Sequence, residues 1–262
     1  MFKSPGDIAL SLGGFDIHWY GITMSLAMLF GILVILFVRK KFFKDISVDE
    51  ICDISFLLII IGLISARIYY VLLDYTYFLR NPLEIPAIWN GGISIQGAIA
   101  GGILFGIYYA KKHKINFLRY ADLFCFGIVT GQIIGRWGNF FNSEAFGLPT
   151  NLPWKLFIPF ASRPLEYRDF EYFHPTFLYE SLLSVITLAI LFTLLNKYKT
   201  RKDGFLFFLY LILYSISRLL VETIRVDSVL NVGTIHAAHI ASAVFIAISA
   251  VCLIFIYKKK TV

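Results

Sequence analysis

Long apolar segments alternate along this chain with short basic tracts. A run of about 18 or more apolar residues is typical of a bilayer-spanning helix, because about 20 helical residues cross the hydrocarbon core. We expect seven such spans, at residues 17–38, 51–72, 92–110, 120–134, 177–195, 204–221 and 236–257. Backbone groups in lipid must be satisfied within a segment, and the short alternating segments of a β-barrel are absent. The pattern predicts an all-α polytopic membrane protein.

Composition supports a membrane protein. Hydrophobic residues make up 58% of the chain and charged residues 16%, whereas soluble domains average about 25% charged residues. The three cysteines all lie in expected spans without a C-x-x-C pair, which favours buried apolar fillers over disulfides or metal ligands. The N-terminus lacks the features of a cleavable signal peptide.

The net charge of +7 is distributed unevenly. Basic tracts follow the first, third and fifth expected spans and end the chain, at residues 39–44, 111–119, 197–202 and 258–260. Short basic loops mark the cytoplasmic side of a membrane protein. We therefore expect the N-terminus outside and the C-terminus in the cytoplasm, with the bilayer, and no nucleic acid, as the partner of these charges.

The chain reads as one membrane-embedded domain over residues 1–262. Residues 135–175, between the fourth and fifth spans, are rich in proline and aromatic residues and predict an irregular extracytoplasmic insert. A shorter outer loop at 74–90 leads into a glycine-rich tract at 91–97. Such backbone is tolerated at membrane depth only where protein or water covers it, so we expect a broken segment beside a site.

Charged residues inside spans cost roughly 2.5–3.5 kcal/mol each on insertion scales, so they are functional candidates. The sixth span carries Tyr214, Arg218, Glu222 and Arg225 at steps that place all four on one helical face. The structural alternative is an Arg218–Glu222 ion pair with Arg225 extended to the membrane surface. Two arginines and a tyrosine in one stripe favour a functional role.

The end of the fourth span carries Gln132, Arg136 and Asn139 on one face, with Gly135 and Gly138 allowing close backbone approach. The alternative is an interfacial anchor made by Arg136 and its neighbouring tryptophan.

The second span contains Arg67, for which a structural bridge to Asp74 and direct ligand contact are both open. Glu180, near the start of the fifth span, suits a structural role at a helix N-terminus. His236 and His239 make only a weak case for a metal site. Several guanidinium groups near one membrane face predict an anionic phospholipid head group as ligand.

Residues 135–147 resemble the signature G-R-x-G-N-F-x-N-x-E-x-x-G of the bacterial prolipoprotein diacylglyceryl transferase family, which fixes eight of thirteen positions. Further matches to the family follow in order along nearly the whole chain. They are residues 18–21, 62–70, 91–94, His174 with Pro175, 178–180, and the stripe of the sixth span.

The resemblance implies transfer of the diacylglyceryl group of phosphatidylglycerol to the lipobox cysteine thiol of a preprolipoprotein, next to its signal peptide. A thioether forms and glycerol phosphate is released, at the outer face of the bacterial cytoplasmic (inner) membrane. The resemblance implies no metal and no organic cofactor.

The resemblance also implies site residues. Arg136 and Arg218 would stabilise charge on the leaving phosphate, and Gln96 and Glu144 complete the expected catalytic set. The expected substrate-binding residues are Tyr20, Arg67, Asn139, Asn142, Gly147, His174, Tyr214, Glu222 and Arg225.

The chain departs from the family pattern at two positions. Gln96 stands where many members have a histidine proposed as a base, and Phe177 stands where many have glutamine. Three explanations are open: the base is His18, His174 or Glu144; or position 96 contributes hydrogen bonds; or this is an inactive homologue. An anionic-lipid transporter or scramblase is the alternative from another class, and a membrane phosphatase lacks an evident nucleophile or acidic cluster.

Overall fold

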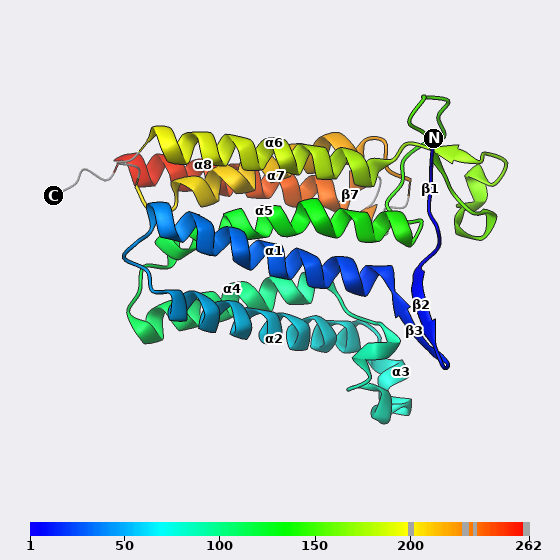
Figure 1. Ribbon diagram of the computed structural model, residues 1–262, viewed down its shortest axis with the longest axis horizontal. Helices are drawn as coiled ribbons and strands as arrows, with labels where there is room; N and C mark the ends of the chain where they lie inside the picture. The colour runs from blue at the N-terminus through cyan, green and yellow to red at the C-terminus, as the bar shows by residue number, and fades with distance from the viewer. Residues whose placement is uncertain (199–201, 227–230, 233–234, 259–262) are drawn as a thin grey trace. The chain divides into compact units, whose positions relative to one another are not determined.

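The computed structural model describes residues 1–198, 202–226, 231–232 and 235–258 (Figure 1). The described chain is mostly helical and divides into two compact units, one formed by Met1–Phe42 with Ala121–Val262 and the other by Phe43–Tyr120. The single domain expected over residues 1–262 stays a prediction.

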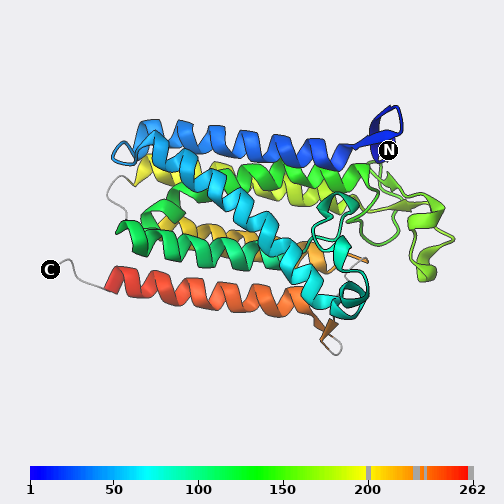
Figure 2. The ribbon, with the colours of Figure 1, turned by 90° about the horizontal axis from the view of Figure 1, so that it is seen from below.

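The first unit contains the helices α1 (Trp19–Phe42), α6 (Thr176–Lys197), α7 (Phe205–Glu222) and α8 (Ala237–Lys258), with most of α5 (Phe117–Phe141). Figures 1 and 2 show α5 to α8 running along one another. Helix α1 approaches α5 at two glycines: a Cβ on Gly31 would lie 3.0 Å from the Gly127 carbonyl oxygen. Small residues are the usual means of such close packing in membranes.

The second unit contains α2 (Val48–Leu73), α3 (Tyr75–Arg80), the 3-10 turns η1 (Pro82–Glu84) and η2 (Ile88–Asn90), and α4 (Ile95–His113). Ser47 and Glu50 form a reciprocal capping box that begins α2. Helix α4 packs against α2 through Gly97 and Gly101, where an added Cβ would collide with Ser65.

Among the described residues, six helices are long and apolar enough to cross a membrane: α1, α2, α5, α6, α7 and α8. This confirms the polytopic membrane fold. Helix α4, which begins beside Gln96 and ends with Lys111 and Lys112, is not among the six. The count of seven and the orientation stay predictions.

The start of the first expected span and the end of the fourth differ from the helices observed. Helix α1 begins at Trp19, because residues Ile8–Leu12 (β2) and Phe15–His18 (β3) form an antiparallel hairpin before it. Helix α5 continues to Phe141, so the insert begins at 142 rather than 135. Gly138 does not end α5, because it lies against Thr23 and Tyr20 of α1, where a larger residue would collide.

The insert is also more regular than expected. Leu156–Phe157 (β4) pairs in parallel with Phe2–Lys3 (β1) and antiparallel with Tyr172–Phe173 (β5). The turns η3 (Phe160–Ser162) and η4 (Leu165–Tyr167) lie between β4 and β5. A buried cluster supports this sheet, made of Phe146, Leu156, Ile158, Phe173 and Phe177. A further two-stranded hairpin joins Asn231–Val232 (β6) to Ile235–His236 (β7) before α8.

Candidate active site

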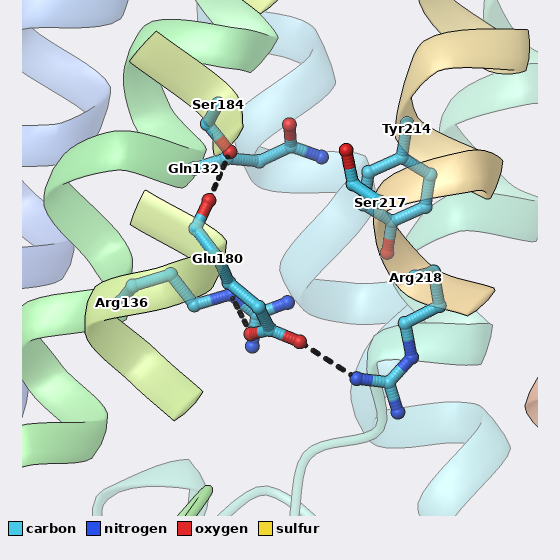
Figure 3. A pocket seen from close by; sticks show the side chains of 7 residues that line it. All are labelled: Gln132, Arg136, Glu180, Ser184, Tyr214, Ser217 and Arg218. Atoms are coloured by element: carbon cyan, nitrogen blue, oxygen red, sulfur yellow. Dashed lines mark hydrogen bonds and ion pairs between the residues drawn. The ribbon is translucent and has the colours of Figure 1, made fainter. Parts of the chain in front are cut away.

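Glu180, in the second turn of α6, is surrounded by arginines from two other helices and from the residues after α7. Its Oε2 atom lies 2.6 Å from Arg136 Nε, and its Oε1 atom accepts a hydrogen bond of 2.8 Å from Arg218 Nη1 (Figure 3). Arg225 Nη1 lies 3.8 Å from the same Oε1 atom. Only 6% of Glu180 is exposed, so these contacts are screened much less than surface ion pairs.

Arg218 also pairs with Glu222, one turn further along α7, at 2.7 Å between Nη2 and Oε2. The structural alternative considered for this stripe, an Arg218–Glu222 ion pair, is therefore present. Glu222 is 2% exposed. We call Arg136, Glu180, Arg218, Glu222 and Arg225 the arginine–glutamate cluster. Its three guanidinium groups and two carboxylates leave one net positive charge when all are ionised.

The helix ends bring the cluster together. Arg136 lies in the last turns of α5, Glu180 in the second turn of α6, and Arg218 in the last turns of α7. The Ser181 hydroxyl donates to the Ile133 carbonyl at 3.0 Å, which ties α6 to α5 beside the cluster.

At the far end of α7, Asp122 fixes the start of that helix. Its carboxylate accepts the backbone N–H groups of Gly204 at 2.9 Å and Phe207 at 2.8 Å. These are N–H groups that a helix start leaves without internal partners. Asp122 lies on α5 and is only 1% exposed. Its two hydrogen bonds therefore fix where α7 begins along α5, and thereby where Arg218 of α7 lies along α5.

A pocket of about 270 Å³, counted with its open mouth, adjoins the cluster (Figure 3). Its lining residues are Gln132, Arg136, Glu180, Ser184, Tyr214, Ser217 and Arg218. Three residues of the predicted site, Arg136, Tyr214 and Arg218, therefore line one pocket. Gln132, predicted to share a helical face with Arg136, lines the same pocket.

The signature tract makes a tight turn after α5. The Asn139 side chain donates to Glu144 Oε1 at 2.8 Å, and the Glu144 N–H donates to the Asn139 carbonyl at 3.0 Å. Ser143 and Ala145 have left-handed backbone conformations, with φ of 54° at each, which non-glycine residues rarely adopt. The N–H of Asn142 bonds back to the Gly138 carbonyl. The tract is therefore held by its own hydrogen bonds.

Gly147 connects this turn to the end of α7. Its N–H donates to the His174 carbonyl at 2.9 Å, and it forms an isolated β-bridge with Arg225. A Cβ at this position would lie 2.7 Å from the Ile224 carbonyl oxygen. A side chain would therefore displace the segment that carries Arg225.

His174 is engaged by its neighbours. Its Nδ1 atom lies 3.1 Å from the Tyr179 hydroxyl, which also accepts the Trp154 indole N–H at 2.9 Å. Indole nitrogen only donates, so the tyrosine proton is available to Nδ1, which favours the neutral ring with its proton on Nε2. Burial lowers the pKa of His174 below the ordinary value of 6.5.

Arg67 binds backbone carbonyls, and not Asp74, among the described residues. It donates to four backbone carbonyls: Nε to Ile85, Nη1 to Gly91 and Gly92, and Nη2 to Glu84. In the part of the chain described, no ion pair joins Arg67 to Asp74, so the expected bridge was wrong. Arg67 orders the loop before α4, while its predicted substrate contact stays a prediction.

Gln96 lies in the second unit with Arg67, in the first turn of α4. Its Oε1 atom accepts the Ser94 hydroxyl at 2.5 Å, which leaves its amide N–H groups directed away from that bond. The expected broken segment is a short loop, with Gly91 and Gly92 at φ of 84° and 71°.

The other predicted residues are placed as follows. Tyr20, in the first turn of α1, packs on Gly138. His18, considered as a base, lies 3.4 Å from Asp7 and is exposed. The side chain of His236 lies outside the described residues, and His239 lies in α8.

The central carboxylate of the cluster was missed from the sequence. Glu180 was expected to have a structural role at a helix start, yet it contacts all three arginines of the cluster. The available signal was a carboxylate inside an apolar span, where an unpaired charge is costly.

Comparison with known proteins identifies the family of this chain. The model of the family described as prolipoprotein diacylglyceryl transferase matches residues 7–255. A phosphatidylglycerol–prolipoprotein diacylglyceryl transferase of Nostoc sp. is 43% identical over 99% of this chain and 92% of its own length. One of Thermotoga maritima is 44% identical over 92% of this chain and 83% of its own. The chain belongs to the prolipoprotein diacylglyceryl transferase family.

Proposed function

We propose that this protein transfers the diacylglyceryl group of phosphatidylglycerol to the lipobox cysteine of a preprolipoprotein. The single observation that carries the proposal is the buried arginine–glutamate cluster, which keeps one net positive charge beside a pocket. The names of the relatives supply the two substrates. Phosphatidylglycerol carries one negative charge, which matches the charge of the cluster.

In the proposed reaction, the cysteine sulfur attacks the glycerol carbon that bears the phosphate. A sulfur–carbon bond forms and the carbon–oxygen bond breaks, so the bonding electron pair leaves on glycerol phosphate. The thiol proton goes to a base. The phosphate changes from a singly charged diester to a monoester that carries a second negative charge, and that developing charge is what the site must stabilise.

Arg136 and Arg218 are the proposed phosphate ligands. Arg136 is nearest to Glu180 through Nε, so the N–H groups at the outer edge of its guanidinium group can donate to a phosphate oxygen. Glu180 and Glu222 hold Arg218 from two sides, which fixes its orientation before substrate arrives. Preorganised cations need little rearrangement when the leaving group becomes more negative.

Glu144 is the proposed proton acceptor. Asn139 holds one of its carboxylate oxygens, and a free thiol with a pKa near 8.5 is only slightly ionised at neutral pH. Gln96 acts in this scheme as a hydrogen-bond donor, because its oxygen is engaged by Ser94 and its amide cannot take a proton. His174 contributes as a neutral ring that supports the tract at Gly147.

The proposed orientation has seven spans, the N-terminus outside, the C-terminus in the cytoplasm and the site at the outer face of the bacterial inner membrane. Helices α1, α6 and α8 each end in basic residues on one side of their unit (Figure 1). The arginine–glutamate cluster lies toward the opposite ends of these helices, since Glu180 is near the start of α6. The positive-inside rule then supports an outward-facing site.

A complementation experiment tests the proposal. The chain is expressed in a bacterium depleted of its own transferase, and its lipoproteins are examined for the diacylglyceryl modification. We expect growth and modified lipoproteins. If the purified protein instead moves fluorescent phosphatidylglycerol across vesicle membranes and leaves lipoproteins unmodified, it is a transporter; if it does neither, it is an inactive homologue.

A further inference from the structure

The pocket beside the arginine–glutamate cluster has two levels. Each of its three helices contributes a charged residue and a polar residue one turn deeper: Arg136 with Gln132, Glu180 with Ser184, and Arg218 with Tyr214. One turn is about 5.4 Å along a helix. Figure 3 shows the two levels, with Gln132, Ser184 and Tyr214 displaced together to one side of Arg136, Glu180 and Arg218. We call the uncharged level the inner level.

Most hydroxyl protons of the pocket are already used within the helices. The Ser184 hydroxyl donates to the Glu180 carbonyl at 2.8 Å, and the Ser217 hydroxyl donates to the Leu213 carbonyl at 2.9 Å. Gln132 gives one amide proton to the hydroxyl of the buried Tyr210 at 2.9 Å. These bonds hold the three side chains in place.

Two donors of the inner level remain. Within the described residues, the Tyr214 hydroxyl has no hydrogen-bond partner, and Gln132 has only its bond to Tyr210, so its second amide proton is free. Donors at membrane depth are costly when they lack an acceptor. Acyl chains offer none, whereas a lipid that enters this level with an oxygen atom would supply one.

We propose that the inner level binds an acyl-ester carbonyl of the phospholipid, with Tyr214 and Gln132 as donors. This inference rests on the proposed function, in which the phosphate lies on Arg136 and Arg218. The ester groups of a glycerophospholipid are a few bonds from its phosphate on the acyl-chain side, and the inner level lies one turn deeper than the arginines. The reacting carbon lies between these two anchors, so both would align it for attack.

A site with these two donors should prefer a diacyl phospholipid with ester linkages. A dialkyl analogue with ether linkages keeps the head group and chains but lacks both carbonyls. It would leave the Tyr214 and Gln132 donors without a partner, a loss that we expect to lower kcat/KM about tenfold.

The test compares dioleoyl phosphatidylglycerol with its dialkyl ether analogue, using purified full-length protein, a lipobox peptide and mass spectrometry. The wild type should prefer the ester lipid about tenfold. Tyr214→Phe should lose about that factor with the ester lipid and lose little more with the ether lipid. Tyr257→Phe, which removes an exposed hydroxyl in α8, should keep the wild-type preference.

Equal turnover of both lipids by the wild type would overturn the inference, as would an unchanged ester preference in Tyr214→Phe. Retention of each lipid by the protein is measured in parallel by native mass spectrometry. If no thioether forms with either lipid, the proposed function fails. In that case the inner level is still tested by retention: a preference for the ester lipid that disappears in Tyr214→Phe supports it, and equal retention overturns it.

Discussion

Arg136 Nε and Glu180 Oε2 lie 2.6 Å apart, so a buried carboxylate of α6 fixes a guanidinium group of α5. The same carboxylate contacts Arg218 and Arg225. A carboxylate shared by three arginines keeps them close despite their mutual repulsion. Its role is one of positioning: it holds the groups that bind the phosphate.

Glu180→Gln should therefore lower kcat about tenfold or more without raising KM for phosphatidylglycerol. The substitution increases the net charge of the cluster, so the anionic lipid still binds. Arg136 loses its ion-pair partner, and Arg218 loses a charged hydrogen-bond partner, an interaction worth about 1.5–3 kcal/mol. Steady-state kinetics with varied lipid separate the two constants. Glu166→Gln, at an exposed position of the insert, is the control. A raised KM with normal kcat would contradict the positioning role.

Arg136→Lys should lower kcat/KM on the order of a hundredfold. The ammonium group of lysine keeps the charge, but it cannot contact Glu180 through one nitrogen and a phosphate through a fork of two others. The peptide modification assay measures the loss, and exposed Arg80→Lys serves as the control. Near-normal activity in Arg136→Lys would show that only charge is needed at this position.

Asp122→Ala should destabilise the protein by about 1–3 kcal/mol, since two buried backbone N–H groups at the start of α7 lose their acceptor. We expect a lower Tm in detergent and reduced activity, because α7 carries Arg218. Asp169→Ala, at an exposed position of the insert, should leave Tm unchanged. An unchanged Tm in Asp122→Ala would mean that other contacts hold α7.

Protonation of His174 at acidic pH should lower the stability of the folded insert. Because the folded pKa lies below 6.5, the unfolded chain takes up the proton first as pH falls. The stability of the folded state is therefore full above about 6.5 and decreases as pH falls from there toward the folded pKa. Hydrogen exchange of residues 142–175 at pH 7.5 and 5.5 measures this, with His174→Gln as the variant that should lose the pH dependence. An equal pH dependence of hydrogen exchange in the wild type and in His174→Gln would show that another residue causes the effect.

The sequence predicted the membrane fold because each span needs a long uncharged run, and that signal is local. The stripe on α7 was equally visible, since helical periodicity places Tyr214, Arg218 and Glu222 on one face. The sheet formed by β1, β4 and β5 was not predictable, because its strands have two residues each and leave no periodic pattern. In addition, β1 precedes β4 by more than a hundred residues.

Interactions between distant segments were the main omission at the site. Glu180 looked like an ordinary residue of a helix start, and only the packing of α5, α6 and α7 shows that it meets three arginines. For Arg67 a bridge to Asp74 and a ligand contact were both open from the sequence, yet its partners in the structure are backbone carbonyls, which no sequence pattern identifies. The continuation of α5 through Gly135 and Gly138 likewise depends on packing against α1.

We propose that this chain, with glutamine at position 96, is an active transferase whose arginines stabilise the leaving phosphate. The most direct test incubates purified wild type and Arg218→Ala with phosphatidylglycerol and a lipobox peptide, and measures the peptide mass. We expect the wild type to add one diacylglyceryl group to the cysteine, and Arg218→Ala, present at equal abundance, to add essentially none. An unmodified peptide with the wild type, or normal modification by Arg218→Ala, would contradict this proposal.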